Sequence, residues 1–166
     1  LTATTRKAVK AAITAGINVT IATGRHYNSA VHLAKEVGIN TPMVCHDGAL
    51  IAEASTGKIL SAHLLPLEIA KGALNIAKKY DSLIIQIFNP KDKVYAGRNY
   101  HIDMARHFIK SPRPYTLRGL YNYFRGFVFV PVKNAGDIEK AKKTMVDSPA
   151  KVLVCGDSGQ LQAFIK

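Results

Sequence analysis

The 166-residue sequence predicts an α/β protein with two parts, a parallel core over residues 1–65 and an α+β domain over residues 66–166. In the first part, helical patterns alternate with short apolar strands, which is typical of a parallel sheet covered by helices. Pro66 opens the second part, where a helix followed by strands occurs more than once. This order favours an open sheet with its helices on one face.

The first part begins with a helix over residues 2–15, in which apolar side chains recur at helical spacing and Gly16 provides a stop. The next elements are a strand over residues 17–22, a helix over 28–37 that ends at Gly38, and a strand over 43–45. Two further strands, over residues 49–53 and 58–63, flank a turn that contains glycine. We expect these two strands to form a hairpin.

The second part begins with an amphipathic helix over residues 67–80. Its buried face is expected to carry Ile69, Ala73, Ile76 and Ala77. The remaining elements are strands over 83–88 and 93–96, a helix over 100–109, a loop over 111–114, a strand over 126–132, a helix over 135–145, a strand over 151–155 and a helix from residue 160.

The most informative stretch joins the strand over residues 17–22 to Thr23, Gly24 and Arg25. A hydroxyl, a flexible glycine and a guanidinium then lie at the amino end of a helix, where backbone N–H groups without partners favour a phosphate. The next strand is followed by Asp47 and Gly48. Because ligands gather at the carboxyl ends of parallel strands, we expect these residues to line one crevice.

Each of these residues also has a plainer interpretation. Thr23 could cap the helix that follows it. Arg25 could form a structural ion pair, and Asp47 with Gly48 could form an ordinary turn.

The composition narrows the class of protein. The formal net charge of +12 is compatible with a nucleic-acid partner, an anionic small substrate or an absent acidic complement. No apolar run is long enough to span a membrane, and no signal segment opens the chain. Cys45 and Cys155 lack metal-ligand spacing, so we expect buried free thiols in a reducing compartment and a cytoplasmic protein.

Histidines and aromatic residues give weaker signals. No two of the six histidines are spaced as a metal pair, and only His26 and His46 flank the expected crevice. An aromatic and basic cluster could stack bases and hold phosphates, but the favoured interpretation is domain core plus a specificity loop in which Arg118 and Tyr121 face substrate. The cluster comprises Tyr115, Arg118, Tyr121, Tyr123, Phe124, Arg125, Phe127 and Phe129.

Four stretches, residues 4–9, 16–25, 47–51 and 56–60, resemble the Cof-type phosphatases of the haloacid dehalogenase (HAD) superfamily. The resemblance covers most of residues 1–88 and continues loosely to the end of the chain. It implies a Rossmann-like (Rossmannoid) core with an inserted α/β cap, here a partial core over residues 1–65 and the cap over 66–166. It also implies a Mg2+-dependent phosphomonoesterase that works through an aspartyl-phosphate.

Site roles follow from the same resemblance. Thr23 matches the residue that binds the transferring phosphoryl group, and Gly24 and Arg25 match the residues that shape the loop beside the substrate. Asp47 precedes Gly48 where the family usually has Asn-Gly. Since a carboxylate would repel a phosphate, we expect Asp47 to hold Arg25 or to point away.

The chain starts on a helix and stops inside an apolar helical pattern, so we expect a strand before residue 1 and further elements after residue 166. The aspartate nucleophile, the acid/base aspartate, the phosphate-stabilising lysine and the Mg2+ ligands of the family would then lie outside this chain. The stretch over residues 155–159 resembles the start of the acidic metal motif, but it fits the last strand and helix of the cap better. We therefore assign Asp157 no catalytic role.

These observations predict a phosphatase of sugar phosphates or other small phosphorylated metabolites, with no membrane or nucleic-acid partner. The fragment itself is expected to be inactive. One alternative is a basic RNA- or nucleotide-binding module without catalysis, and another is a catalytically dead phosphate-sensing domain. Because the absent segments would be rich in aspartate, the fragment would be more basic than its parent, which weakens the nucleic-acid interpretation.

Overall fold

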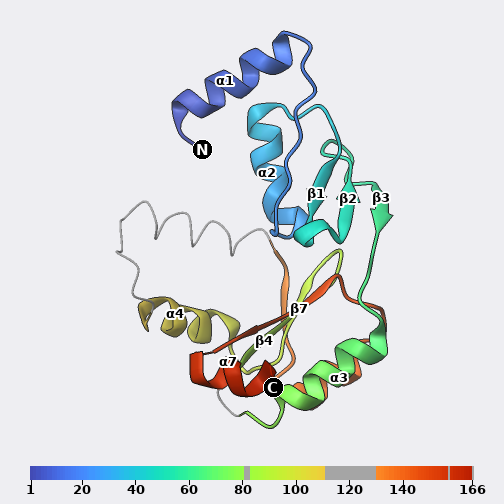
Figure 1. The fold of residues 1–166 in the computed structure, drawn as a ribbon, viewed down its shortest axis with the longest axis vertical. Coiled ribbons are helices and arrows are strands. Elements are labelled where there is room, and N and C mark those ends of the chain that lie inside the picture. Colours follow the sequence, from blue (N-terminus) through green and yellow to red (C-terminus); the bar gives the residue numbers. More distant parts are fainter. Residues whose placement is uncertain (81–82, 111–129, 157, 166) are drawn as a thin grey trace. The chain divides into compact units, whose positions relative to one another are not determined.

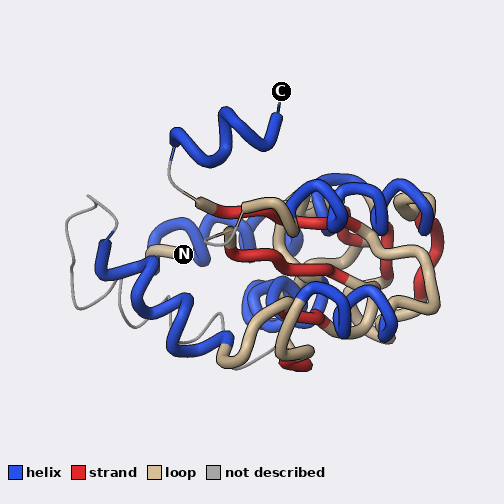
Figure 2. The backbone as a smooth tube through the Cα atoms, turned by 90° about the horizontal axis from the view of Figure 1, so that it is seen from below, coloured by secondary structure: helices blue, strands red, loops and turns tan. Residues whose placement is uncertain are grey.

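The computed structural model describes residues 1–80, 83–110, 130–156 and 158–165. The chain divides into two compact units, Leu1–His63 and Leu64–Lys166, which we call unit 1 and unit 2 (Figure 1). Both units contain helices and strands, which Figure 2 colours blue and red. No helix in the described ranges is both long and apolar enough to cross a membrane.

Unit 1 contains two helices and a three-stranded sheet of order β1-β2-β3. Its elements are α1 (Ala3–Thr14), α2 (Tyr27–Val37), β1 (Met43–Cys45), the 3-10 turn η1 (His46–Gly48), β2 (Leu50–Ala52) and β3 (Ile59–Ala62). Thr2 caps α1 by accepting a hydrogen bond from the backbone N–H of Thr5 at 3.1 Å, and Gly38 ends α2 in the left-handed region. The predicted helices and the hairpin of β2 and β3 are confirmed.

The predicted strand over residues 17–22 is wrong for most of its length. Only Ala22 forms a bridge, parallel to Val44, and the backbone N–H of Val44 donates to the carbonyl of Ile21 at 2.9 Å. Upstream, side chains take the place of a neighbouring strand: Asn40 Oδ1 accepts from the N–H of Val19, and Thr41 Oγ1 donates to its carbonyl. The β1-β2-β3 sheet is antiparallel, so parallel pairing in unit 1 is limited to this bridge among the described residues.

The core of unit 1 forms where α2 packs against β1 and β2. Ala30, Val31 and Ala34 on α2 meet Met43, Cys45, Leu50 and Ala54. All seven side chains are buried. In contrast, α1 has no buried residue, and its Arg6 pairs with Glu36 of α2. The α2 core therefore fixes the loop that leads into α2 and the turn that follows β1.

Unit 2 contains a four-stranded sheet of order β6-β5-β4-β7, in which β5 and β6 are parallel and the other pairs antiparallel. Its strands are β4 (Ile84–Phe88), β5 (Lys93–Tyr95), β6 (Val132–Asn134) and β7 (Lys151–Cys155), and its helices are α3 (Leu67–Ala77), α4 (Tyr100–Lys110), α6 (Ile138–Thr144) and α7 (Ser158–Ile165). The other expected elements are present. The predicted strand over 126–132 lies mostly outside the described residues, and its described part is wrong, because the strand begins only at Val132 and runs to Asn134.

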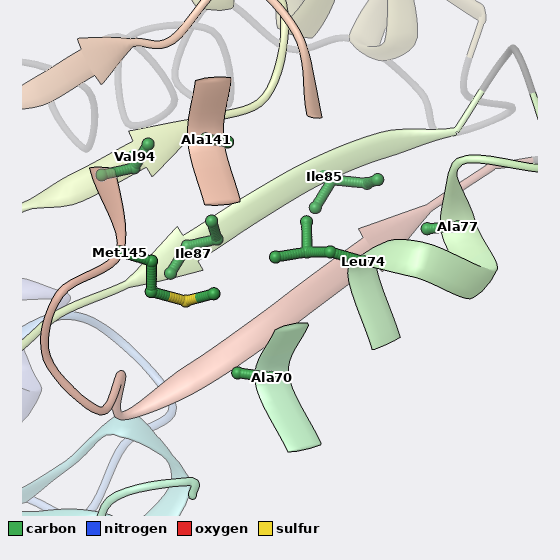
Figure 3. Close-up of a cluster of buried hydrophobic side chains, with 8 residues drawn as sticks. All are labelled: Ala70, Leu74, Ala77, Ile85, Ile87, Val94, Ala141 and Met145. Atoms are coloured by element: carbon green, nitrogen blue, oxygen red, sulfur yellow. The ribbon is translucent and has the colours of Figure 1, made fainter. Parts of the chain in front are cut away.

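The core of unit 2 lies between the sheet and the helices α3 and α6. Figure 3 shows Ile85 and Ile87 of β4 facing Leu74 of α3 and Met145. The predicted buried face of α3 is wrong in part, since Ile69 is 60% exposed and Ile76 is 46% exposed. The helix carries two apolar stripes, and the stripe of Ala70, Leu74 and Ala77 is the buried one. Its small alanines let the helix approach the sheet closely.

Candidate functional site

The loop of Thr23, Gly24 and Arg25 joins the extended segment of unit 1 to α2. Thr23 Oγ1 accepts a hydrogen bond from the backbone N–H of Arg25 at 3.2 Å, and the backbone N–H of Thr23 donates to the carbonyl of Val44 at 2.9 Å. The Thr23 side chain is half-buried and the Arg25 side chain is exposed. The Thr23 hydroxyl thus accepts one hydrogen bond within the loop, and its own hydrogen remains available for donation.

The helix that follows is capped by His26, not by Thr23. Nδ1 of His26 accepts from the backbone N–H of Asn28 at 3.1 Å, and the His26 carbonyl accepts from Ser29 and Ala30. The capping role left open for Thr23 is therefore excluded. The expectation of unpaired N–H groups at the start of the helix is also wrong for these three residues, because His26 satisfies them. Recognition of an anion here would depend on the loop's side chains instead.

The turn after β1 lies against this loop, as the parallel order at Ala22 and Val44 predicts. The backbone N–H of Asp47 donates to the carbonyl of Thr23 at 3.3 Å, and the backbone N–H of His46 donates to the carbonyl of Arg25 at 3.0 Å. The structure thus brings Thr23, Arg25 and Asp47 together, although about twenty residues separate them in the sequence. Whether they bind substrate is a separate question that this placement makes testable.

Gly24 lies in close contact with the Asp47 side chain. A Cβ atom at residue 24 would overlap the Asp47 carboxylate. The carboxylate therefore lies directly against the backbone of Gly24, on one side of the loop. A dianion bound on that same side would meet an unfavourable charge.

The turn itself is conformationally unusual. His46 and Asp47 have φ angles of 53° and 59°, and Gly48 has 99°. Three successive residues with positive φ are uncommon, although histidine and aspartate are among the residues with side chains that adopt this region more often than most. Such backbone conformations persist where the surrounding structure holds them, and here the hydrogen bonds to the loop do so.

His26 and His46 lie beneath the loop. They are 2% and 1% exposed, and their rings pack edge to face with centroids 4.7 Å apart. The sequence identified both as neighbours of the crevice but gave no reason to expect their contact. The only feature of the sequence that hinted at this contact is that His26 follows Arg25 directly and His46 precedes Asp47 directly.

The other candidate residues divide into those the structure describes and those it does not. Cys45 is buried and free, and burial raises the pKa of its thiol to about 11. Cys155 is also free, but it is half-buried, which differs from the prediction of full burial. Asp157 and the aromatic and basic cluster of residues 115–129 lie outside the described residues.

No group of three His, Cys, Asp or Glu side chains in the described part of the chain could hold a metal ion. Arg25 forms no hydrogen bond or ion pair through its guanidinium with any residue the structure describes, so the structural ion pair considered for it is not formed there. These residues do not fit a Mg2+ site, but they can offer a hydroxyl and a positive charge to an anion.

The sequence is similar to those of known hydrolases. A family profile described as haloacid dehalogenase-like hydrolase matches residues 1–165. A 100-residue stretch is 28% identical to a protein of Buchnera aphidicola (subsp. Baizongia pistaciae) named "Putative phosphatase", and it covers 60% of this chain and 37% of that protein.

Two solved structures show the same fold. A haloacid dehalogenase-like hydrolase from B. subtilis superposes with a TM-score of 0.74 and 14% identity, over 98% of this chain and 58% of that one. A sugar phosphatase of HAD subclass IIB gives a TM-score of 0.67 and 13% identity, over 99% of this chain and 55% of that one. The chain thus spans little more than a third of its curated relative and somewhat over half of these two structures.

Proposed function

Because this chain belongs to the haloacid dehalogenase-like hydrolase family, we propose that it is part of a phosphomonoesterase for sugar phosphates or other small phosphorylated metabolites. The family resemblance and the α/β fold predicted from the sequence are confirmed. The name of the Buchnera relative and the sugar phosphatase among the similar structures support the proposed reaction and substrate class. The single observation that carries the proposal is the Thr23 hydroxyl, which accepts a hydrogen bond from the backbone N–H of Arg25 in the loop that also carries the exposed Arg25 side chain.

In this proposal Thr23 Oγ1 donates its hydrogen to an oxygen of the phosphoryl group. Thr23 Oγ1 accepts a hydrogen bond from the N–H of Arg25, which leaves the hydroxyl hydrogen available for donation. Donors held in place before the reaction stabilise charge that develops on the transferring group. The Arg25 guanidinium adds a positive charge that can pair with two phosphoryl oxygens. The phosphoryl group lies on the side of the loop away from the Asp47 carboxylate.

The rest of the catalytic machinery is proposed to lie outside residues 1–166. An aspartate nucleophile that forms an aspartyl-phosphate, together with Mg2+ and its ligands, would complete the site in the whole protein. We propose that unit 1 is part of the catalytic core, that unit 2 is the cap, and that the protein is cytoplasmic, as the two free thiols favour. Residues 1–166 alone are then expected to hydrolyse nothing.

The test uses the full-length protein encoded around this chain, with p-nitrophenyl phosphate and a panel of sugar phosphates as substrates. Thr23→Val removes the hydroxyl while keeping a branched side chain, and it should lower kcat/KM by about a hundredfold, the usual effect of losing one such donor. Thr23→Ser is the matched control and should keep most of the activity. Equal activity of the valine variant and the wild type would refute the role of Thr23.

A further inference from the structure

His26 joins the loop of residues 23–25 to α2. It follows this loop directly in the chain, and its side chain is 2% exposed. Nδ1 of its ring accepts a hydrogen bond from the backbone N–H of Asn28 at 3.1 Å, and its carbonyl accepts from the N–H groups of Ser29 and Ala30. One residue therefore holds three donors at the start of α2, and it fixes the place where the loop enters the helix.

The hydrogen bond from Asn28 determines the protonation state of the His26 ring. A ring nitrogen that accepts an N–H group carries a lone pair and no proton, so this ring is neutral with its hydrogen on Nε2. A histidinium ring carries hydrogens on both nitrogens and offers no acceptor. Protonation of Nδ1 would therefore place two N–H groups against each other, and the side-chain cap of α2 would be lost.

The His26 ring also packs against His46, the first residue of η1. The two rings meet edge to face with their centroids 4.7 Å apart, and the His46 side chain is 1% exposed. The backbone N–H of His46 donates to the carbonyl of Arg25 at 3.0 Å. The ring contact and this hydrogen bond together connect the loop to the turn after β1. Desolvation of a charge on either ring would oppose the contact, and two charged rings would repel each other.

Four further titratable side chains adjoin the two histidines, from the loop, α2, β1 and η1. Arg25 stays positively charged between pH 5 and pH 8. Burial raises the pKa of the Cys45 thiol to about 11, and burial, followed by the charge of Cys45, raises the pKa of Tyr27, so both stay neutral in this range. β2 contributes no titratable side chain. The Asp47 carboxylate lies against Gly24 and would attract a charged ring, so Asp47→Asn is part of the test.

We propose that His26 is a positioning residue for phosphate binding by Thr23 and Arg25, and that it acts only while its ring is neutral, so that acid uncouples the loop from α2 and from η1. The inference deepens the proposed function and rests on it for the ligand. It adds a form of regulation, in which the site holds its anion at neutral pH and releases it on acidification. Histidine ordinarily changes its charge in this pH range, whereas the usual capping residues serine, threonine and asparagine do not.

The first measurement follows the 13C,15N-labelled chain without ligand from pH 8 to pH 5. The ring signals of His26 report its protonation, and the backbone amides of Thr23, Arg25 and Asn28 report the loop and the cap. We expect these amides to shift with the same midpoint as the His26 ring. His26→Asn keeps a capping side chain and removes the titration, so its amides should shift much less. The proposal is overturned if the wild-type amides do not follow the ring, or if they shift equally in His26→Asn.

The second measurement uses sulfate as the probe, because sulfate keeps its charge between pH 5 and pH 8 whereas phosphate does not. Calorimetry of the wild type should show an affinity about fivefold lower at pH 5.5 than at pH 7.5, the effect expected from one lost cap. His26→Asn should bind sulfate equally at the two pH values. A wild type that binds sulfate equally at both would overturn the proposal.

His32→Asn is the matched control, because it makes the same change at an exposed histidine of α2. It should keep the pH dependence of the wild type. In Asp47→Asn the loop amides should still follow the His26 ring, and a loop that no longer titrates would assign the effect to Asp47 instead. If sulfate shifts no amide of residues 23–25 at either pH while these amides still follow His26, the proposed function fails and the coupling through His26 stands.

Discussion

Replacing Lys93 with methionine should stabilise the chain at neutral pH. Burial, and secondly the charge of Lys151, lower the pKa of Lys93 from 10.5 to about 8. One pKa unit corresponds to about 1.4 kcal/mol, so keeping this ammonium protonated in the folded state disfavours folding by about 3 kcal/mol at pH 7. Lys93→Met removes that penalty but also loses the hydrogen bond to Tyr100, which contributes about 1 kcal/mol. The net effect should be a higher free energy of unfolding at pH 7.

The sign of the pH dependence follows from which state holds the proton. Between pH 8 and about pH 10.5 the unfolded chain keeps the Lys93 proton while the folded chain has lost it. The free energy of unfolding of the wild type therefore rises with pH across this window, and Lys93→Met lacks that contribution. Cys45 titrates in both proteins and cancels in the difference. Burial raises the pKa of the Cys155 thiol and the charge of Lys93 lowers it, so the comparison is made in a Cys155→Ser background.

Urea unfolding followed by circular dichroism at pH 7, 8, 9 and 10 measures this difference. The wild type should gain about 2–3 kcal/mol on the variant between pH 7 and pH 10, with most of the change above pH 8. A constant difference at every pH would show that Lys93 titrates at its ordinary pKa. The argument that its ammonium is desolvated on the sheet face would then be wrong.

Three further predictions concern unit 1. Gly24→Ala should lower the free energy of unfolding, measured in urea, by about 1–3 kcal/mol, because the added Cβ would overlap the Asp47 carboxylate. Adding Asp47→Ala to the same chain should restore part of this loss. If the effects of the two substitutions on the free energy of unfolding are simply additive, the overlap is contradicted. Asp47→Asn removes the negative charge and keeps a residue that tolerates positive φ. The affinity for inorganic phosphate, measured by calorimetry, should therefore rise severalfold. An unchanged affinity would contradict repulsion between the Asp47 carboxylate and the phosphate. Iodoacetamide at pH 8 should modify half-buried Cys155 well before buried Cys45, whose thiol has a pKa of about 11. Mass spectrometry of the labelled peptides measures the order of modification. Earlier labelling of Cys45 would contradict the prediction.

Local patterns were sufficient to predict much of the fold. β1 and β7 begin and end where predicted, because each is a short apolar run with clear neighbours, such as Pro42 before β1. The strand over residues 17–22 was not predictable in the same way. Its apolar pattern is strand-like, but pairing depends on a partner, and β1 offers only three residues.

The face that a helix buries depends on its neighbours as well as on its own sequence. α3 carries apolar residues on two sides, so periodicity alone could not choose between the stripe with Ile69 and the stripe with Leu74. The choice depends on which stripe fits against β4, and that is a property of the packed unit.

The candidate site was predictable where sequence order determines position. Thr23 and Asp47 follow successive extended segments, so their closeness follows from one parallel contact. The capping by His26 was missed because histidine is not among the favoured capping residues. The burial of Lys93 in β5 was missed because a lysine in a strand ordinarily indicates an exposed position.

The central claim is that the Thr23 hydroxyl and the Arg25 guanidinium bind a phosphoryl group. The most direct measurement is the response of the backbone amides of residues 23–25 to inorganic phosphate, compared between the 15N-labelled wild type and Thr23→Val. We predict saturable shifts at all three amides in the wild type and their loss in the variant. The claim would be contradicted if phosphate does not shift the amide signals of this loop, or if it shifts them equally in the wild type and in Thr23→Val.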